Sequence, residues 1–339
     1  MFRAISLGHE FSMTHILLTG AGFSRNWGGW LADEAFEYLL GCAEIDVHLR
    51  ALLWRGKENG RGFEDTLTDL QHVYNMNKSP DDQRRLNALT SALVGMFNEM
   101  SNAFMLRPFE PQTNRTYMIR TFLNRFDVIF TLNQDTLLEQ HYLDDNVQLN
   151  SNGRWRGWQI PGTQVLGQGS VQGSVHDKTA MREPTDEFGF AIQPRMQPYF
   201  KLHGSCNWVA GQSGIRILIM GGNKAVNIQQ FPLLSWYHEE FGRQLCTPGA
   251  CLMVIGYSFS DTHINEAIAK ACDAGSLKLF IIDPSGVDVI DKRKPVSIRA
   301  PDPYMDRLTP HIIGASRRTL AEIFNGDVVE HGKIGKFFV

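Results

Sequence analysis

The chain has 339 residues, of which 43% are hydrophobic and 20% are charged, and its formal net charge is −3. This composition excludes a wholly disordered chain, and a chain of this length can fold without disulfides or a structural metal. The charge balance gives no reason to expect direct nucleic-acid binding, and no apolar run approaches the roughly 20 residues that span a membrane.

The N-terminal segment 1–12 does not resemble a signal peptide, because no basic start is followed by an apolar stretch. We expect Met13 to be the true start, with residues 1–12 either foreign to the native protein or a disordered leader. The five cysteines include no CxxC pair, which disfavours a zinc ribbon and a disulfide framework. We expect the protein to be cytoplasmic.

Short apolar runs alternate with helical patterns along most of the chain. The run 15–19 predicts a buried strand that stops at Gly20, followed by a tight turn over 20–24 and a helix over 31–42. The segment 45–112 has helical spacing and no strand pattern, so we expect a helical insertion there. The insertion would lie within one domain that spans residues 13–330.

The strand pattern resumes after the insertion. Residues 150–195 show no clear period and predict irregular loops. Helices are expected over 231–246, from 260 or 261 to 272, and over 316–325. Because strands alternate with helices, the fold class is predicted to be α/β, with a doubly wound, parallel, Rossmann-like sheet and the helical insertion. The further predicted strands are 127–131, 199–202, 215–220, 251–255 and 277–282.

Polar and glycine-rich segments follow the predicted strands. Ligands of doubly wound sheets bind at the carboxyl ends of the strands, and a glycine-rich turn at a helix start offers backbone N–H groups to a diphosphate. We therefore expect a ligand site at these ends. The segments are Gly20-Ala21-Gly22-Phe23-Ser24, Asn133 with Asp135, Gly256-Tyr257-Ser258, and Asp283.

Several common nucleotide and metal motifs are missing. The dehydrogenase fingerprint G-x-G-x-x-G would need glycine at position 25, where Arg25 stands, so a hydride-transfer enzyme is disfavoured. The sequence contains neither the P-loop pattern G-x-x-x-x-G-K-[ST] nor H-E-x-x-H.

Four strings in chain order are more specific: GAGFS at 20–24, TLNQD at 131–135, KLHGS at 201–205 and GYSFSD at 256–261. In this order they resemble the Sir2 (sirtuin) superfamily, particularly its bacterial SIR2-like branch found in antiphage defence, over most of residues 14–285. The resemblance implies that NAD binds at the strand ends. It assigns the diphosphate to Gly20, Ala21, Gly22, Phe23 and Ser24, the nicotinamide ribose and amide to Asn133 and Asp135, catalysis to His203, and the adenosine half to Gly256, Ser258 and Asp283.

The sequence also departs from the deacetylase sirtuins. They carry four zinc-binding cysteines in CxxC pairs, which this chain lacks, and their G-I-P-x-F-R loop is replaced here by residues 25–30. The resemblance therefore implies a metal-free NAD+ hydrolase that uses NAD as substrate and releases nicotinamide and ADP-ribose, with Asn133 and His203 as catalytic residues. Two alternatives stay open: a module that senses NAD or ADP-ribose without turnover, and a zinc-free deacylase or ADP-ribosyltransferase.

The resemblance implies two kinds of protein partner, a second copy of the chain in a homo-oligomer and a HerA-like ATPase. Asp261 is expected to be a helix cap, and His141 and His263 are expected to be structural because no motif surrounds them. The sequence leaves open the activating trigger, the number of subunits and the preference between NAD and NADP.

Overall fold

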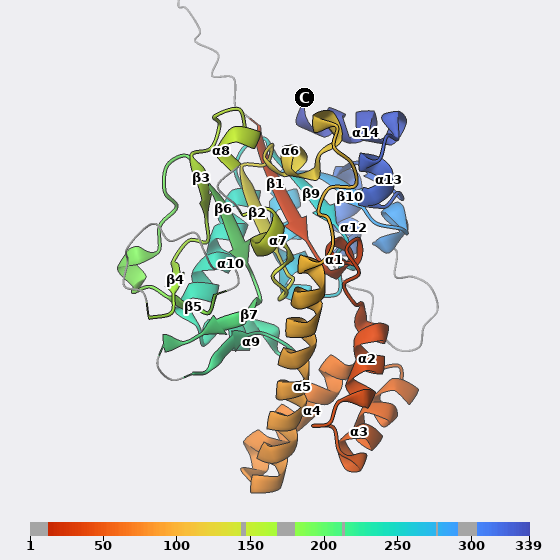
Figure 1. Ribbon diagram of the computed structural model, residues 1–339, viewed down its shortest axis with the longest axis vertical. Coiled ribbons are helices and arrows are strands. Elements are labelled where there is room, and N and C mark those ends of the chain that lie inside the picture. Colours follow the sequence, from red (N-terminus) through yellow and green to blue (C-terminus); the bar gives the residue numbers. More distant parts are fainter. Residues whose placement is uncertain (1–12, 144–146, 168–179, 212–213, 276, 291–303) are drawn as a thin grey trace, which may run out of the picture.

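The computed structural model describes residues 13–143, 147–167, 180–211, 214–275, 277–290 and 304–339, so the expected leader at 1–12 lies outside the described residues. A seven-stranded, all-parallel sheet flanked by helices forms the centre of the molecule (Figure 1). The sheet has the order β11-β10-β9-β1-β2-β6-β3. Its strands are β1 (Thr14–Thr19), β2 (Val128–Thr131), β3 (Gly157–Gln159), β6 (Met196–Lys201), β9 (Ala250–Ile255), β10 (Lys278–Ile282) and β11 (Ile312–Ser316).

The strand order reverses at β1. From β1 the chain builds β2, β3 and β6 on one side and then returns to add β9, β10 and β11 on the other. This is a doubly wound sheet, and it confirms the predicted Rossmann-like α/β fold. In such sheets the loops diverge at the reversal, and ligands bind there, outside the carboxyl ends of the strands.

Of the six α-helices between β1 and β2, the four within residues 32–105 project beyond the carboxyl end of β1 (Figure 1). The longest starts as its sequence predicts, because the Ser79 hydroxyl accepts a hydrogen bond from the Asp82 N–H and Pro80 takes the first helical position. The longest helix also contacts the body of the molecule through α7 (Leu137–His141). The four are α2 (Ala32–Gly41), α3 (Val47–Glu58), α4 (Phe63–Asn77) and α5 (Pro80–Met105).

A second, four-stranded sheet of short strands has the order β4-β5-β7-β8. Its strands are β4 (Thr163–Val165), β5 (Arg182–Pro184), β7 (Gly204–Val209) and β8 (Arg216–Leu218). The remaining helices are α1 (Ala21–Arg25), α6 (Ile119–Leu123), α7 (Leu137–His141), α8 (Val147–Asn150), α9 (Lys224–Gln229), α10 (Pro232–Leu245), α11 (Thr262–Asp273), α12 (Met305–Leu308), α13 (Leu320–Phe324) and α14 (Val328–Gly335).

Three expectations from the sequence need correction. The turn at 20–24 is mostly the one-turn helix α1, and the expected loops at 150–195 contain β3, β4 and β5, whose three residues each are too short to show a period. The expected helix over 316–325 begins only at Leu320, because the chain before it forms β11. Gly314 interrupts the apolar pattern by which this strand could be recognised in the sequence. A Cβ at this position would lie 2.6 Å from the Phe280 ring, so only glycine fits beneath that ring.

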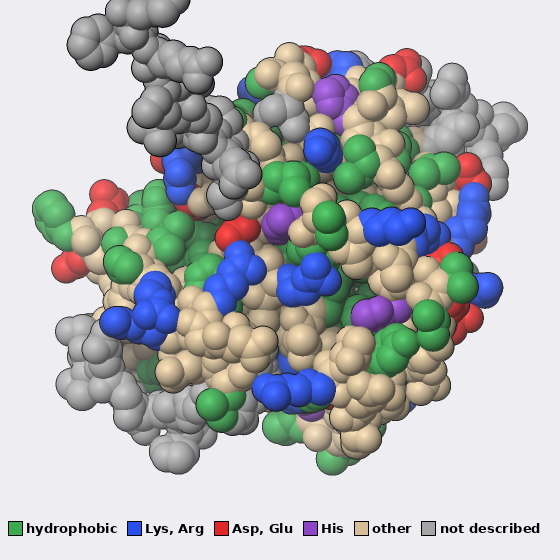
Figure 2. Space-filling model, turned by 90° about the horizontal axis from the view of Figure 1, so that it is seen from above, with side chains coloured by type: hydrophobic (Ala, Val, Ile, Leu, Met, Phe, Trp, Pro, Cys, Tyr) green, Lys and Arg blue, Asp and Glu red, His purple; other side chains and the backbone are tan. Residues whose placement is uncertain are grey.

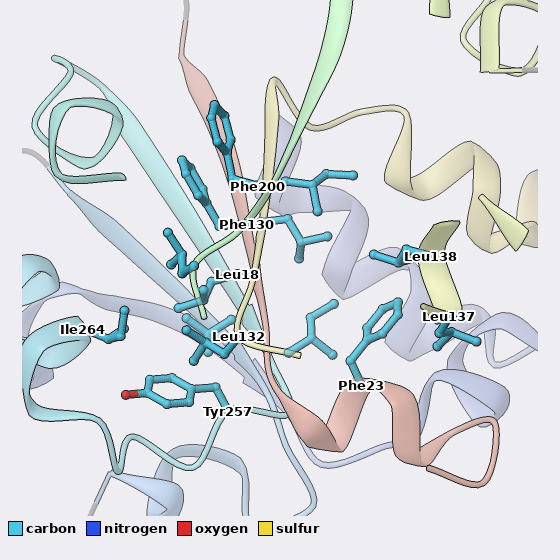
Figure 3. Close-up of a cluster of buried hydrophobic side chains, with 14 of the residues drawn as sticks. Leu18, Phe23, Phe130, Leu132, Leu137, Leu138, Phe200, Tyr257 and Ile264 are labelled. Atoms are coloured by element: carbon cyan, nitrogen blue, oxygen red, sulfur yellow. The ribbon is translucent and has the colours of Figure 1, made fainter. Parts of the chain in front are cut away.

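Apolar side chains anchor the segments at the carboxyl end of the sheet. Phe23 of α1 is buried and reaches toward Leu137 and Leu138 of α7 (Figure 3). Phe130 of β2 and Phe200 of β6 stack with ring centroids 5.0 Å apart. The polar residues that follow these strands are therefore held by a close-packed core directly beside them.

The top of the molecule in Figure 1 is seen head-on in Figure 2. Basic side chains there are scattered among hydrophobic and uncharged ones.

In the described part of the chain, no helix is long and apolar enough to cross a membrane.

Candidate functional site

The carboxyl ends of five neighbouring strands lie in one row. The register pairs Thr19 with both Thr131 and Ile255, while Thr131 also pairs with Lys201 and Ile255 with Ile282. Each strand of this row is followed within two positions by a residue of the predicted site. These residues are Gly20, Asn133, His203, Gly256 and Asp283.

The glycine turn after β1 is locked to the turn after β9. The Gly20 N–H donates to the Ile255 carbonyl at 3.0 Å, and the Gly22 N–H donates to the Gly256 carbonyl at 2.9 Å. Gly256 has a φ of +63°, and a Cβ on it would lie 2.3 Å from the carbonyl carbon of Gly22. Only glycine satisfies both the positive φ and this backbone contact.

This arrangement engages several amides that were expected to face a diphosphate. The N–H groups of Gly20 and Gly22 bind the β9 segment, and the Phe23 N–H donates to the Gly20 carbonyl at 2.8 Å. A diphosphate would have to be held by other groups of the turn, where Ala21 is exposed.

A chain of hydrogen bonds joins three predicted site residues. The Ser24 hydroxyl donates to Oδ2 of Asp135 at 2.8 Å and accepts from Nδ2 of Asn133 at 2.9 Å. The Ser24 hydroxyl has a single proton, which it donates to Asp135, so it can only accept from Asn133, and the amide nitrogen of Asn133 faces it. This chain therefore fixes which end of the Asn133 amide is its oxygen.

The Asn133 amide oxygen is an available acceptor. The side chain is 9% exposed, and its own N–H donates to Oγ1 of Thr131 at 3.0 Å. Among the described residues, none donates a hydrogen bond to Oδ1 of Asn133. Oδ1 of Asn133 is not among the buried side-chain atoms that lack a partner, so it keeps some exposure and can accept a hydrogen bond from a ligand hydroxyl or water.

His203 lies in a cluster of three imidazoles. It is 2% exposed, and its Nε2 lies 3.1 Å from Nε2 of His263 on α11. The third ring, His238 on α10, has its centroid 5.3 Å from that of His263, and its Nε2 contacts the Leu202 carbonyl at 2.9 Å. His263 and His238 are partly exposed.

Burial holds the pKa of the His203 imidazole well below its usual value. The charge of Asp261 opposes this shift, whereas Lys224 and the two neighbouring rings reinforce it. Nζ of Lys224 lies 2.9 Å from Oδ1 of Asp261 and 3.0 Å from Oε2 of Glu64 on α4. His203 is therefore neutral at neutral pH and able to accept a proton.

A fully buried ion pair supports the segment that carries Asn133. Nζ of Lys201 lies 2.6 Å from Oε1 of Glu139 and also donates to the backbone carbonyl of Asp135. The side chains of Lys201 and Glu139 are 0% and 2% exposed. The Tyr199 hydroxyl donates to the second oxygen of Glu139 at 3.3 Å. The pair thus ties the end of β6 to the residues that follow β2.

The family model described as the SIR2-like domain matches residues 127–297, which is half of the chain.

The chain belongs to the SIR2-like family.

The Sir2 superfamily membership expected from the four motifs is thereby confirmed, and it implies a function related to NAD. A search of the curated proteins found no match to the chain.

The remaining predicted residues of this SIR2-like chain lie at the rim of the site. Ser258 is exposed and hydrogen bonded to Ser260, with their hydroxyl oxygens 2.9 Å apart. Asp283 is partly exposed, and its Oδ1 accepts the Ser285 N–H at 2.8 Å, which leaves its second oxygen for a ligand. Asp261 takes the position before α11 but binds Lys224 instead of a helix N–H, so it is not the expected cap.

Sequence reasoning missed the residues that surround the SIR2-like motifs. No sequence motif surrounds His263, and the structure brings its ring into contact with His203. One clue lay in its position near the start of the helix that follows the Gly256 turn, at the same sheet edge. A second clue was Lys201, a lysine inside an apolar strand, which requires a buried partner.

In the part of the chain that the structure describes, no three His, Cys, Asp or Glu side chains are grouped so that they could hold a metal ion.

Proposed function

We propose that this SIR2-like chain is an NAD+ glycohydrolase that transfers the ADP-ribosyl group of NAD to water, giving nicotinamide and ADP-ribose. One observation carries the proposal: Asn133 and His203 each lie two residues beyond the paired ends of β2 and β6. Asn133 presents an amide oxygen to which none of the described residues donates, and His203 presents a neutral buried imidazole. Family membership supplies the relation to NAD.

The chemistry follows from these two side chains. The bond between nicotinamide and ribose breaks, its electron pair leaves with the nicotinamide nitrogen, and positive charge develops on the ribose. Oδ1 of Asn133 accepts a hydrogen bond from a ribose hydroxyl or from the attacking water and so fixes its position. The His203 imidazole accepts the proton. Positioned acid–base groups of this kind contribute roughly 10²–10⁴-fold in rate.

Water is the acceptor that the sequence favours. The chain lacks the two CxxC pairs of the deacetylase sirtuins, and residues 25–30 replace their substrate-side loop. We therefore propose hydrolysis in preference to deacylation.

We further propose a biological setting from the resemblance to defence proteins. An enzyme that depletes NAD is toxic when it is always active, so it must be held off until infection. The setting is a cytoplasmic effector of bacterial antiphage defence, controlled by assembly into a homo-oligomer and by a HerA-like ATPase.

The experiment is NAD turnover by the purified chain, with and without the protein encoded beside it. We expect nicotinamide and ADP-ribose in equal amounts. His203→Ala and Asn133→Ala should each abolish turnover while the melting temperature stays within a few degrees of wild type. The matched control is His48→Ala, which changes an exposed histidine of α3. Undiminished turnover in either site variant would refute the assignment. NAD consumption that requires an acyl-lysine peptide, in stoichiometric amounts, would identify a deacylase instead.

A further inference from the structure

A buried base needs a route by which its proton leaves. Hydrolysis of NAD converts a cationic nicotinamide into a neutral leaving group and adds water to the ribose, so each turnover releases one proton. His203, the base in the proposed function, is 2% exposed and cannot pass that proton directly to bulk water. The proton must reach solvent through a neighbouring group.

His263 is the group that the geometry provides. Its Nε2 lies 3.1 Å from Nε2 of His203, which is hydrogen-bonding distance for two nitrogens. A hydrogen bond between these atoms requires that one of them carries the proton and the other accepts it. His263 is partly exposed to solvent, whereas His203 is buried. The two rings therefore form a line from the interior to the surface.

We propose that His263 is a positioning residue that orients His203 and carries the proton of NAD hydrolysis from it to solvent. This inference rests on the proposed function. In the starting state Nε2 of His203 holds the shared proton and donates it to His263, which leaves Nδ1 of His203 as the free base. As water attacks the ribose, Nδ1 takes the water proton, the shared proton crosses to Nε2 of His263, and Nδ1 of His263 releases a proton to solvent. The rings then return to their first tautomers by exchange with water.

The charges around His263 favour its passing the proton on over its remaining protonated. Burial, together with the charge of Lys224 on α9, lowers the pKa of His263, and Asp261 opposes the shift. The ring also faces His203 beyond β6 and His238 on α10, while Glu64 on α4 reaches it only through Lys224. Neither imidazole of the pair thus carries a second proton at neutral pH, and Asp261 stabilises the cation that forms during the transfer.

His238 differs from its neighbours although it completes the cluster. Its Nε2 contacts the Leu202 carbonyl, and that contact occupies the nitrogen that a relay would need. We therefore assign it no part in the transfer.

The test compares kcat, KM and the pH profile of nicotinamide release for wild type, His263→Gln, His263→Ala and the exposed control His48→Gln. We expect both His263 variants to lose about tenfold or more in kcat, since they disable an acid–base route, with KM unchanged within about twofold. Added imidazole should restore His263→Ala in a concentration-dependent way, and the acidic limb of the pH profile should move. His48→Gln should behave as wild type.

The outcomes separate this inference from the function on which it rests. If wild type releases nicotinamide and the His263 variants keep its kcat, the relay is wrong and the hydrolase assignment stands. If wild type releases none, with or without its neighbour-encoded protein, both fall. Nitrogen NMR of the histidine rings gives an independent check: one of the two rings should carry its proton on Nε2 and the other on Nδ1. Two rings that both carry the proton on Nδ1 would overturn the shared hydrogen bond.

Discussion

Removing the buried ammonium of Lys201 tests how the site is supported. In Lys201→Met the Glu139 carboxylate stays buried without its partner, because the two side chains are 0% and 2% exposed in the folded protein. Breaking one side of a buried ion pair costs about 3–5 kcal/mol. The entropy of unfolding is about 2.1 cal/mol/K per residue, which amounts to roughly 0.7 kcal/mol/K for the 339-residue chain. The melting temperature should therefore fall by about 4–7 °C.

The assay is thermal unfolding followed by circular dichroism, combined with nicotinamide release. Glu139→Gln should destabilise in the same range, and the Lys201→Met/Glu139→Gln double variant should lose clearly less than the sum of the two, because no charge is then left unpaired. The matched control is Lys270→Met on α11, which breaks an exposed pair with Glu266 and should cost no more than about 1 kcal/mol. A Lys201→Met shift as small as the control, or strict additivity in the double variant, would refute the reasoning.

Three further predictions concern acid stability, the glycine contact and the polar chain. Burial lowers the pKa of His238 to about 4, so between pH 6.5 and 4 the unfolded chain binds a proton that the folded chain does not. The free energy of unfolding should therefore fall as the pH drops through that window, and this ring should account for roughly 3 kcal/mol of the fall. In His238→Gln, the free energy of unfolding measured with denaturant should depend less on pH over the same window. Gly256→Ala should destabilise by at least about 2 kcal/mol through its positive φ and backbone clash, whereas Gly242→Ala, with open space inside α10, should not destabilise; equal melting temperatures would contradict this. Ser24→Ala should cost about 1–3 kcal/mol and slow nicotinamide release, because it frees the Asn133 amide to rotate; an unchanged rate would show that this orientation is unimportant.

The sequence predicted the central sheet because its strands are continuous apolar runs. β1, β2, β9 and β10 are buried on both faces and end at glycine or polar residues, which is the pattern of parallel strands. Strands of three residues, such as β4 and β5, leave no such pattern. β7 escaped prediction because it follows β6 after only two residues.

The strand-end residues could be proposed from sequence, but their partners could not. Asn133 and His203 each follow a strand, so the shared edge of a parallel sheet predicts that they lie near each other. The contact of His203 with His263 joins residues 60 positions apart, and the Lys201–Glu139 pair spans 62. Such pairings depend on how loops and helices descend onto the sheet, which local patterns do not encode.

Lys224 links the protruding helices to the histidine cluster of the candidate site. A single ammonium group joins Glu64 of α4 to Asp261, and the charge of Asp261 raises the pKa of both paired imidazoles. Nearby, the Gly222 N–H donates to the Thr68 hydroxyl of the same helix. A tilt of α4 would therefore displace Asp261, the counter-ion of the two imidazoles. A protein that binds the protruding helices would thus change the pKa of His203 and His263 without contacting either ring.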